Sequence, residues 1–372
     1  MKISISKESL VDALDAVQGL AGGKIATPVL SSVLLVAEGG RLFLTATDTY
    51  TTITASVPAS VAVGGSSLLP AKKFYSIVKD LSPQDMTISI DEKSHATIKS
   101  GRAVFKLHGA PDDEFPDADR IEGGATVKVS QARIKSALRR VAFSVCAVED
   151  RANLCGVSMK FAGADIELAS TDGRRMSRGF CDADSVVTST CECLVPIRPI
   201  NEILRLLQET GEAEIVIGDN KISVALTGAE GELPVKITTS LVAARFPDIT
   251  PMIPAADKCH RATFSREELQ TVIGRVANMT NELSHSLKFS FSRNQVEITA
   301  NAPDMGEAAE IIECLYDGPE IKIAFGPQYL LDPLRVMPED SVFMDLTDDR
   351  SPMAYRTEAD AFTFVVMPVR LS

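Results

Sequence analysis

Apolar residues recur at helical spacing in six short windows of the chain, and between these windows they alternate with polar residues as they do in strands. Three windows each follow a serine and place apolar side chains four, eight and eleven positions after it. The serines are Ser6, Ser130 and Ser265, and the apolar residues are Leu10, Leu14, Val17, Ile134, Leu138, Val141, Leu269, Ile273 and Val276. A serine hydroxyl at this position accepts a hydrogen bond from a free amide of the first turn. We therefore predict helices over residues 7–18, 131–143 and 266–277, each capped by its serine.

A second kind of window starts at a proline or a glycine and repeats the same apolar spacing. Counted from Pro70, Pro196 and Gly326, its apolar residues are Phe74, Val78, Leu81, Ile200, Leu204, Leu207, Leu330, Leu334 and Met337. Proline suits the first turn of a helix because the amide that it lacks would have no partner there. We predict helices over residues 71–81, 197–208 and 327–337. Pro333 lies inside the last window and removes one helical hydrogen bond, so we expect that helix to be kinked or to start late.

The two kinds of window occur three times in the same order, with an aspartate marker between them. The markers Asp48, Asp172 and Asp304 are 124 and 132 residues apart, close to the 124 and 135 residues between the capping serines. Chance similarity of amphipathic segments is the less favoured explanation, because it would not preserve this order. We predict an α+β protein of three repeated domains in which helices pack beside antiparallel strands. The predicted domains span residues 1–122, 123–252 and 253–372, with linkers at 117–124 and 247–257.

Composition limits the class of protein. The chain has 372 residues, of which 45% are hydrophobic and 24% charged, as in folded globular proteins. Its apolar runs are shorter than the roughly 18 residues of a membrane span, and its first residues lack a secretion signal. We therefore expect a cytoplasmic protein with no membrane partner. The seven cysteines form no Cys-x-x-Cys pair and stand apart from the four histidines, so we expect free thiols, no metal site and no cofactor.

The charged residues are distributed unevenly. The net charge of −12 argues against a general polyanion binder. However, the six predicted helices contain 13 Lys and Arg against 8 Asp and Glu, so the rest of the chain is strongly acidic. Arg133, Lys135, Arg139 and Arg140 make one helix especially basic. Basic helices are often ordinary solvated faces, but this segregation of charge favours a surface that faces a polyanion.

Simple geometry indicates what a basic helical surface would enclose. Six helices about 10 Å across leave a hole of roughly 10 Å when they line a ring, which is too narrow for duplex DNA of about 20 Å. Twelve helices from two chains leave a hole of roughly 28 Å. A head-to-tail dimer of three-domain chains would therefore encircle duplex DNA and contact its phosphates without reading its sequence.

Several sequence motifs agree with this interpretation. They are MKISISKESL at the start, LPAKKF at 69–74, STDGRRM at 170–176, LVAARFPD at 241–248 and VVMPVRL at 365–371, with GGK, TPVL, KSGR and FKL between them. With these motifs the chain resembles the bacterial DNA polymerase III beta subunit, the sliding clamp, over essentially its whole length. The resemblance implies a head-to-tail homodimeric ring with helices inside and sheets outside. It also implies a non-catalytic processivity factor that tethers the DNA polymerase III catalytic subunit to duplex DNA and is placed there by a clamp loader.

The resemblance further implies a pocket between the second and third domains, where the polymerase, the clamp loader and other partners dock a short clamp-binding peptide. Its residues are Leu154, Thr171, Gly173, Arg175, Met176, Pro247, Tyr329, Val365, Val366, Met367, Pro368, Val369, Arg370 and Leu371. The alternative interpretation of the apolar C-terminal residues is that they are simply part of a domain core. Two positions depart from the family pattern, because Arg174 stands where histidine is common and Ser284 where some relatives have an aromatic residue. The peptide preference is therefore expected to differ.

Contacts with DNA and with a second subunit are also implied by the resemblance. The implied DNA contacts are Lys24, Lys72, Lys73, Arg151 and Arg198, in addition to Arg139 and Arg140 of the basic helix. Each of these, taken singly, is also typical of a solvated side chain. At the dimer interface, Phe105 and Leu107 would meet Met279, while Lys73 and Arg102 would face Asp304, Glu307 and Glu310. An unpaired edge strand at this place would allow strand addition between subunits.

Two other functions compete with a clamp. One is a three-domain scaffold that binds partner peptides without DNA, and the other is a hydrolase built on the Asp172–Gly173 turn. The aspartate markers recur as parts of a repeat, which predicts turn-forming roles rather than an acid–base pair. We therefore expect no catalytic residue. Retention on circular but not on linear DNA distinguishes a clamp from both alternatives.

Overall fold

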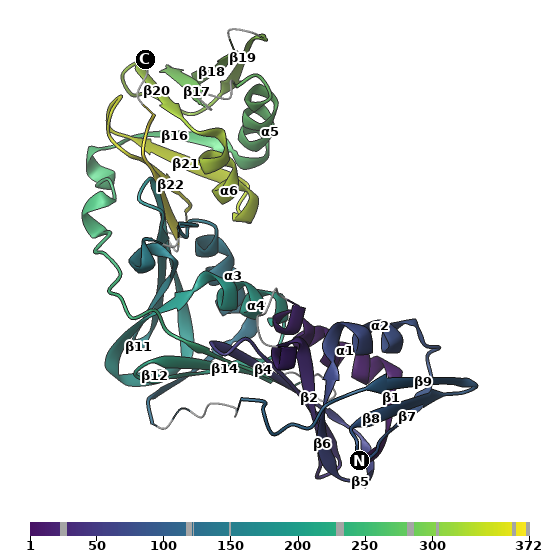
Figure 1. Ribbon diagram of the computed structural model, residues 1–372. Helices are drawn as coiled ribbons and strands as arrows, with labels where there is room; N and C mark the ends of the chain where they lie inside the picture. The colour runs from purple at the N-terminus through teal and green to yellow at the C-terminus, as the bar shows by residue number, and fades with distance from the viewer. Residues whose placement is uncertain are drawn as a thin grey trace.

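The computed structural model describes residues 1–22, 28–116, 121, 123–148, 150–227, 234–280, 286–302, 305–358 and 362–369. The chain forms an open arc of three similar units (Figure 1). Helices lie along the concave side of this arc and sheets along its convex side (Figure 1). No helix within the described ranges combines the length and the apolar character that crossing a membrane requires.

Each unit combines two α-helices with antiparallel strands, and the order of elements repeats. The first unit contains β1 (Lys2–Ser6), α1 (Lys7–Gln18), η1 (Leu20–Gly22), η2 (Pro28–Ser31), β2 (Ser32–Glu38), β3 (Arg41–Thr47), β4 (Thr51–Pro58), β5 (Ser60–Val63), β6 (Gly65–Pro70), α2 (Ala71–Asp80), β7 (Asp85–Ile90), β8 (His95–Ser100) and β9 (Ala103–His108). The second contains β10 (Ala125–Ser130), α3 (Gln131–Ala142), η3 (Ala152–Leu154), β11 (Gly156–Thr171), β12 (Arg175–Pro196), α4 (Ile197–Leu206), β13 (Glu212–Ile217), β14 (Lys221–Thr227) and β15 (Val235–Ser240). After η4 (Thr250–Met252) and η5 (Ala256–Lys258), the third contains β16 (His260–Ser265), α5 (Arg266–Ala277), β17 (Leu287–Ser292), β18 (Gln295–Ala302), β19 (Gly306–Glu313), β20 (Ile321–Phe325), α6 (Pro327–Val336), β21 (Ser341–Leu346), β22 (Met353–Arg356) and β23 (Phe362–Val366).

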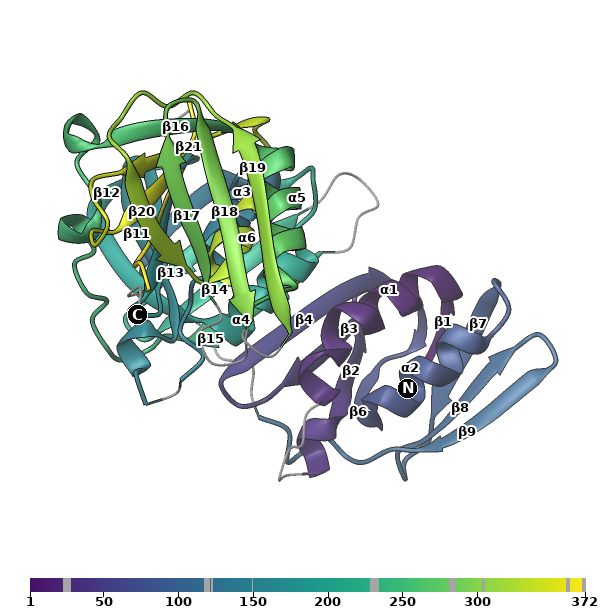
Figure 2. The same ribbon diagram turned by 90° about the horizontal axis from the view of Figure 1, so that it is seen from above.

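Sheets run across both junctions between units. An eight-stranded sheet joins the first two units where β4 pairs with β15, and a six-stranded sheet joins the last two where β12 pairs with β23. The other two sheets stand at the ends of the arc. The first of them ends in β9 and the second in β19, which lies at the side of its sheet near α5 (Figure 2). The arc therefore has a sheet edge at each end.

The six helices occur where the apolar spacing predicts them, and their apolar residues pack against the sheets. Of the eighteen predicted core positions, only Leu204 is partly exposed. The Ser6 hydroxyl accepts a hydrogen bond from Ser9 N at 3.2 Å, and the Ser265 hydroxyl accepts one from Glu268 N at 3.5 Å. These two capping predictions are confirmed.

The predicted serine cap of α3 is wrong. Among the described residues no amide donates to the Ser130 hydroxyl. The next residue, Gln131, is buried instead, and its side-chain amide donates to Glu212 O at 3.3 Å and Thr227 O at 3.2 Å. Contacts with neighbouring strands thus anchor the start of this helix, and sequence-local capping signals do not reveal such contacts.

Of the two alternatives expected for the last helix, the late start is wrong, and a kink at Pro333 stays a prediction. α6 begins at Pro327 and continues through Pro333, which is buried. Proline removes a single helical hydrogen bond, and the packing of Leu330, Leu331 and Leu334 into the core outweighs that loss.

Candidate peptide pocket, inner surface and sheet edges

The turn between β11 and β12 forms part of the junction between the second and third units. Asp172 Oδ1 accepts hydrogen bonds from Arg174 N at 2.8 Å and Arg175 N at 3.0 Å. Gly173 has a φ of 87°, which favours glycine, and its amide donates to Thr171 Oγ1 at 3.1 Å. The aspartate marker is therefore a turn former, as predicted, and Asp48 makes the same two backbone hydrogen bonds in the first unit.

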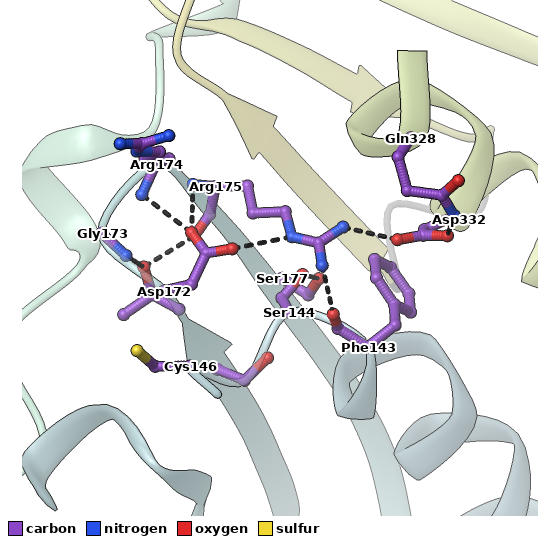
Figure 3. A network of polar contacts seen from close by, with 12 residues as sticks. Phe143, Ser144, Cys146, Asp172, Gly173, Arg174, Arg175, Ser177, Gln328 and Asp332 are labelled. Carbon is purple, nitrogen blue, oxygen red and sulfur yellow. Dashed lines mark hydrogen bonds and ion pairs between the residues drawn. The ribbon is translucent and has the colours of Figure 1, made fainter. Parts of the chain in front are cut away.

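Arg175 connects this turn to the third unit. Its Nε donates to Asp172 Oδ2 at 3.0 Å, its Nη1 to Asp332 Oδ2 at 2.6 Å and its Nη2 to Phe143 O at 2.6 Å (Figure 3). The guanidinium also lies 4.8 Å from the centre of the Tyr329 ring, a cation–π distance. Only 11% of the Arg175 side chain is exposed. This residue therefore holds α6, and with it Tyr329, against the second unit, rather than projecting freely into a pocket.

An apolar floor lies beside this network. Met176 and Val365 are buried and belong to one cluster with Ala169, Leu194, Phe246, Ile249 and Ala354. Leu154, at the end of η3, is 9% exposed, whereas Pro247 is exposed. The pairing of β12 with β23 places Met176 opposite Val365. Met176 and Val365, which the sequence assigns to the pocket from the second and third domains, are thus brought together at this junction.

The C-terminal segment has two distinct parts. Val365 and Val366 are buried in β23, which pairs with β22 of its own unit and with β12 of the second. Beyond them, Met367 N donates to Arg174 O at 2.9 Å and Val369 N donates to Ala324 O at 2.8 Å. Met367 and Val369 are each 38% exposed despite being apolar. Pro368 lies between them, and Arg370 and Leu371 are outside the described residues.

A polar cavity next to this floor was not anticipated from the sequence. It has a volume of about 530 Å³ and lies between the β11–β12 sheet and the segment 245–250. Lys160, Arg178 and Arg245 line it together with Glu167, Glu192 and Asp248. Arg178 Nε donates to Glu167 Oε1 at 2.6 Å, and the backbone amide of Thr250 lowers the pKa of Asp248. The residues come from β11, β12 and the segment 245–250, so no local motif marks the cavity.

The candidate DNA contacts divide into two groups. Lys72, Lys73, Arg139 and Arg198 are exposed on α2, α3 and α4, which line the concave side of the arc (Figure 1). The Arg140 side chain is only 15% exposed, and its Nη2 lies 3.7 Å from Glu339 Oε1 in the third unit. Lys135 and Arg133 also pair with acids, Glu209 and Asp184. Part of the positive charge that the sequence places on α3 is therefore neutralised by other segments.

Two further candidate DNA contacts are not on the described helices. Arg151 immediately precedes η3, and its Nη1 lies 3.5 Å from Asp172 O at the β11–β12 turn. Lys24 is outside the described residues. The position of Arg151 places its charge beside the candidate peptide pocket.

The candidate interface residues lie at the two sheet edges. Phe105 is 40% exposed on β9, where Leu107 is partly exposed, and Arg102 is exposed just before that strand. At the other edge, Glu307 and Glu310 belong to β19, and a Cβ added at Gly306 would lie 3.2 Å from Met279 Cε. Glu310 pairs with Arg275 of the same chain. Lys73 is exposed on α2, and Asp304 is outside the described residues.

The described residues contain no group of three or more His, Cys, Asp or Glu side chains placed to hold a metal ion. Within the same residues the seven cysteines are free thiols. Both carboxylate oxygens of Asp172 accept hydrogen bonds within the network of Figure 3. This carboxylate therefore has a structural role, which weakens the interpretation of the turn as a hydrolase site.

Three repeated units joined by continuous antiparallel sheets, with helices on one side, define a DNA clamp. Family models of the N-terminal, central and C-terminal domains of the DNA polymerase III beta subunit match residues 1–119, 128–248 and 251–370. The beta sliding clamp of Chlamydia pneumoniae is 30% identical over 371 residues, which cover 100% of this chain and 99% of that protein. The beta sliding clamp of Pseudomonas aeruginosa is 32% identical over 376 residues, which cover 100% of both.

Solved structures agree with these matches. The crystal structure of a DnaN sliding clamp from Pseudomonas aeruginosa bound to griselimycin has a TM-score of 0.93 at 30% identity, with 100% of both chains covered. The sliding clamp from Bacillus subtilis also has a TM-score of 0.93, at 25% identity and with 100% of both chains covered. The chain belongs to the DNA polymerase III beta subunit family and is a DNA sliding clamp.

Proposed function

We propose that two copies of this sliding clamp close head to tail into a ring around duplex DNA. The ring acts in the cytoplasm without catalysis, and it tethers the DNA polymerase III catalytic subunit and other partners to the template. Tethering raises the effective concentration of the polymerase at the primer end. A closed ring does not thread onto circular DNA unaided, so a clamp loader opens it.

The position of the sheet edges at the two ends of the arc supports this proposal. The described helices lie on the concave side of an arc whose two ends are the sheet edges β9 and β19 (Figure 1). An exposed edge strand offers unpaired backbone groups to another chain. Pairing of β9 in one copy with β19 in the next, at both ends, closes two arcs into one ring. The apolar Phe105 and Leu107 then become buried at each contact.

The assembly is tested by its mass in solution. We expect a dimer of about 80 kDa, since one chain is 39.9 kDa. Leu107→Lys places a charge in the contact and should shift the protein toward monomer, because an unpaired charge is costly to bury. Val63→Lys is a matched control, since Val63 is 55% exposed at the other edge of the same sheet, on β5. A wild-type protein that sediments as a monomer at micromolar concentration would contradict the ring.

The encircled ligand is tested by retention on DNA. After loading, the wild-type clamp should remain on nicked circular DNA and leave the same DNA once it is linearised. Arg139→Glu should weaken retention and lower the salt dependence, because fewer counterions are released from the phosphates. Arg293→Glu changes the same charge in the β17–β18 turn and serves as the control. Equal loss from both variants would show that net charge, and not the concave surface, matters.

The candidate pocket at the β12–β23 junction is the proposed docking site for partner peptides. Support comes from the exposed apolar tail residues Met367 and Val369, which follow β23, and from the buried Met176 opposite Val365 of that strand. Methionine is flexible and polarisable, so it adapts to several ligands. The DNA polymerase III catalytic subunit, the clamp loader and other proteins with a clamp-binding motif would compete for this pocket. A peptide that binds here should therefore displace any of them.

A further inference from the structure

Two exposed arginines, Arg151 and Arg174, flank the Gly173 turn at the edge of the proposed pocket. The Arg151 guanidinium lies over the turn, since a Cβ added at Gly173 would be only 3.1 Å from Arg151 Nη1. The Arg174 side chain points away from the Asp172 carboxylate (Figure 3). The carbonyl of Arg174 accepts the hydrogen bond from Met367 N, so this arginine stands directly beside the apolar tail.

The neighbouring carboxylates do not neutralise these two arginines. Asp172 receives the amides of its own turn and the Nε of Arg175, and Asp332 pairs with Arg175 and Arg335. In the part of the chain that the structure describes, no carboxylate lies within ion-pair distance of Arg151 or Arg174. Two positive charges therefore remain at the turn that Met367 of the exposed apolar tail contacts, in a chain whose net charge is −12.

We propose that Arg151 and Arg174 select partner peptides that carry acidic residues next to the apolar docking segment. This inference rests on the peptide pocket proposed above. The apolar floor and tail bind the docking segment of any partner, and the two guanidinium groups distinguish partners by the charge beside that segment. Arginine suits this role because it stays charged at every physiological pH and binds a carboxylate through two parallel hydrogen bonds. A histidine at position 174 would be mostly neutral at pH 7 and would discriminate less.

The expected size of the effect follows from the exposure of the arginines. An ion pair at an exposed site contributes a modest stabilisation that salt screens, so two such pairs should give about a 3- to 10-fold preference at low salt. The ratio of the affinities for acidic and neutral peptides should fall toward one at about 1 M salt, because the screening length there is only about 3 Å. The apolar contribution to binding should not weaken with salt.

The test compares two fluorescein-labelled peptides by anisotropy with the full-length protein. Both contain the same clamp-binding segment, and they differ only in having two glutamates or two glutamines beside it. The wild type should prefer the acidic peptide, and Arg174→Gln and Arg151→Gln should each reduce the ratio of the two affinities. Arg293→Gln is the control, because Arg293 is an exposed arginine in the β17–β18 turn of the third unit.

The outcomes separate this inference from the pocket itself. If the wild type binds both peptides equally, or if Arg174→Gln and Arg151→Gln leave the ratio unchanged, the charge selection is wrong while the pocket stands. If Arg293→Gln lowers the ratio as much as Arg174→Gln does, the preference reflects overall charge and the assignment to the two arginines is wrong. If the wild type binds neither peptide, the proposed pocket itself is wrong, and the inference falls with it.

Discussion

The two junctions between units have the same backbone arrangement and differ in a few side chains. At the first junction the Asp48 turn is followed by β4, and Ser240 N donates to Tyr50 O at 2.9 Å. At the second, the Asp172 turn is followed by β12, and Met367 N donates to Arg174 O, also at 2.9 Å. The repeat therefore reproduces the turn, the paired strands and the hydrogen bond between the units.

The side chains that follow the two turns differ. Thr51, after the first turn, is buried and its hydroxyl lies 2.9 Å from the Thr239 hydroxyl. Arg175, after the second turn, instead reaches Asp332 and Phe143 O across the junction. After β15 the chain runs on into the next unit, whereas after β23 it forms an exposed apolar tail. The same scaffold thus gives a closed junction in one place and a candidate docking site in the other.

The deletion of residues 367–372 tests the difference between the two junctions and should have the largest effect, because it removes the exposed tail that only the second junction has. The deletion removes the exposed part of the pocket while leaving Val365 and Val366 in β23. We expect the affinity for a clamp-binding peptide to fall at least about 30-fold, as for loss of a binding hot spot. Anisotropy measures the affinity, and solution mass should still show a dimer. Unchanged affinity would contradict the pocket, and Met367→Ala provides the milder variant should the deletion unfold the protein.

Arg175→Ala should strongly destabilise the second junction. It removes the guanidinium that both Asp332 and Asp172 contact, and these carboxylates are 15% and 18% exposed. Asp332 keeps its longer contact with Arg335, and Asp172 keeps the amides of its turn. Breaking a pair in such a buried setting costs about 3–5 kcal/mol. The matched change Arg205→Ala removes an arginine that is 36% exposed and bonds to Asp15 O and Ala16 O at the first junction. We expect it to cost about 1 kcal/mol in urea unfolding; equal losses would mean that the junctions do not differ.

Leu154→Ala and Leu30→Ala compare two leucines that lie in short helices before the corresponding strands. Leu30 is 6% exposed and Leu154 is 9% exposed. Each substitution should lower the free energy of unfolding by about 2–5 kcal/mol. Only Leu154→Ala should also weaken peptide binding, as measured by anisotropy on folded protein. Weaker binding by Leu30→Ala to the same degree would indicate a general loss of structure instead of a local pocket.

Thr49→Gly should change the free energy of unfolding least, and it should stabilise the protein. Thr49 has a φ of 79° at the position that Gly173 occupies, with a φ of 87°, in the second unit. A β-branched residue is strained in this region, by about 1–3 kcal/mol. We expect Thr49→Gly to raise the free energy of unfolding by about 1 kcal/mol and Gly173→Thr to lower it by a similar amount. A Thr49→Gly variant less stable than the wild type, or a Gly173→Thr variant more stable than it, would show that the two turns are not equivalent.

Local sequence signals correctly predict the three repeated units, the six helices and the turn-forming role of Asp48 and Asp172. These features are local, because apolar spacing, a capping hydroxyl and a turn-forming carboxylate act within a few residues. The resemblance of short motifs also identified the family. Its residue assignments for DNA contact, peptide docking and dimerisation stay predictions.

The availability of each charge and the contacts of each arginine depend on the folded arrangement of distant segments. Arg139 and Arg140 are neighbours in sequence, yet one is exposed and the other pairs with Glu339 of the third unit. Arg175 stays a predicted pocket residue, and the sequence does not reveal its partners Asp332 and Phe143, which are 157 and 32 residues away. The physical reason is that ion pairs and burial depend on which distant segments the fold brings within a few ångströms. Neither spacing nor composition contains that information.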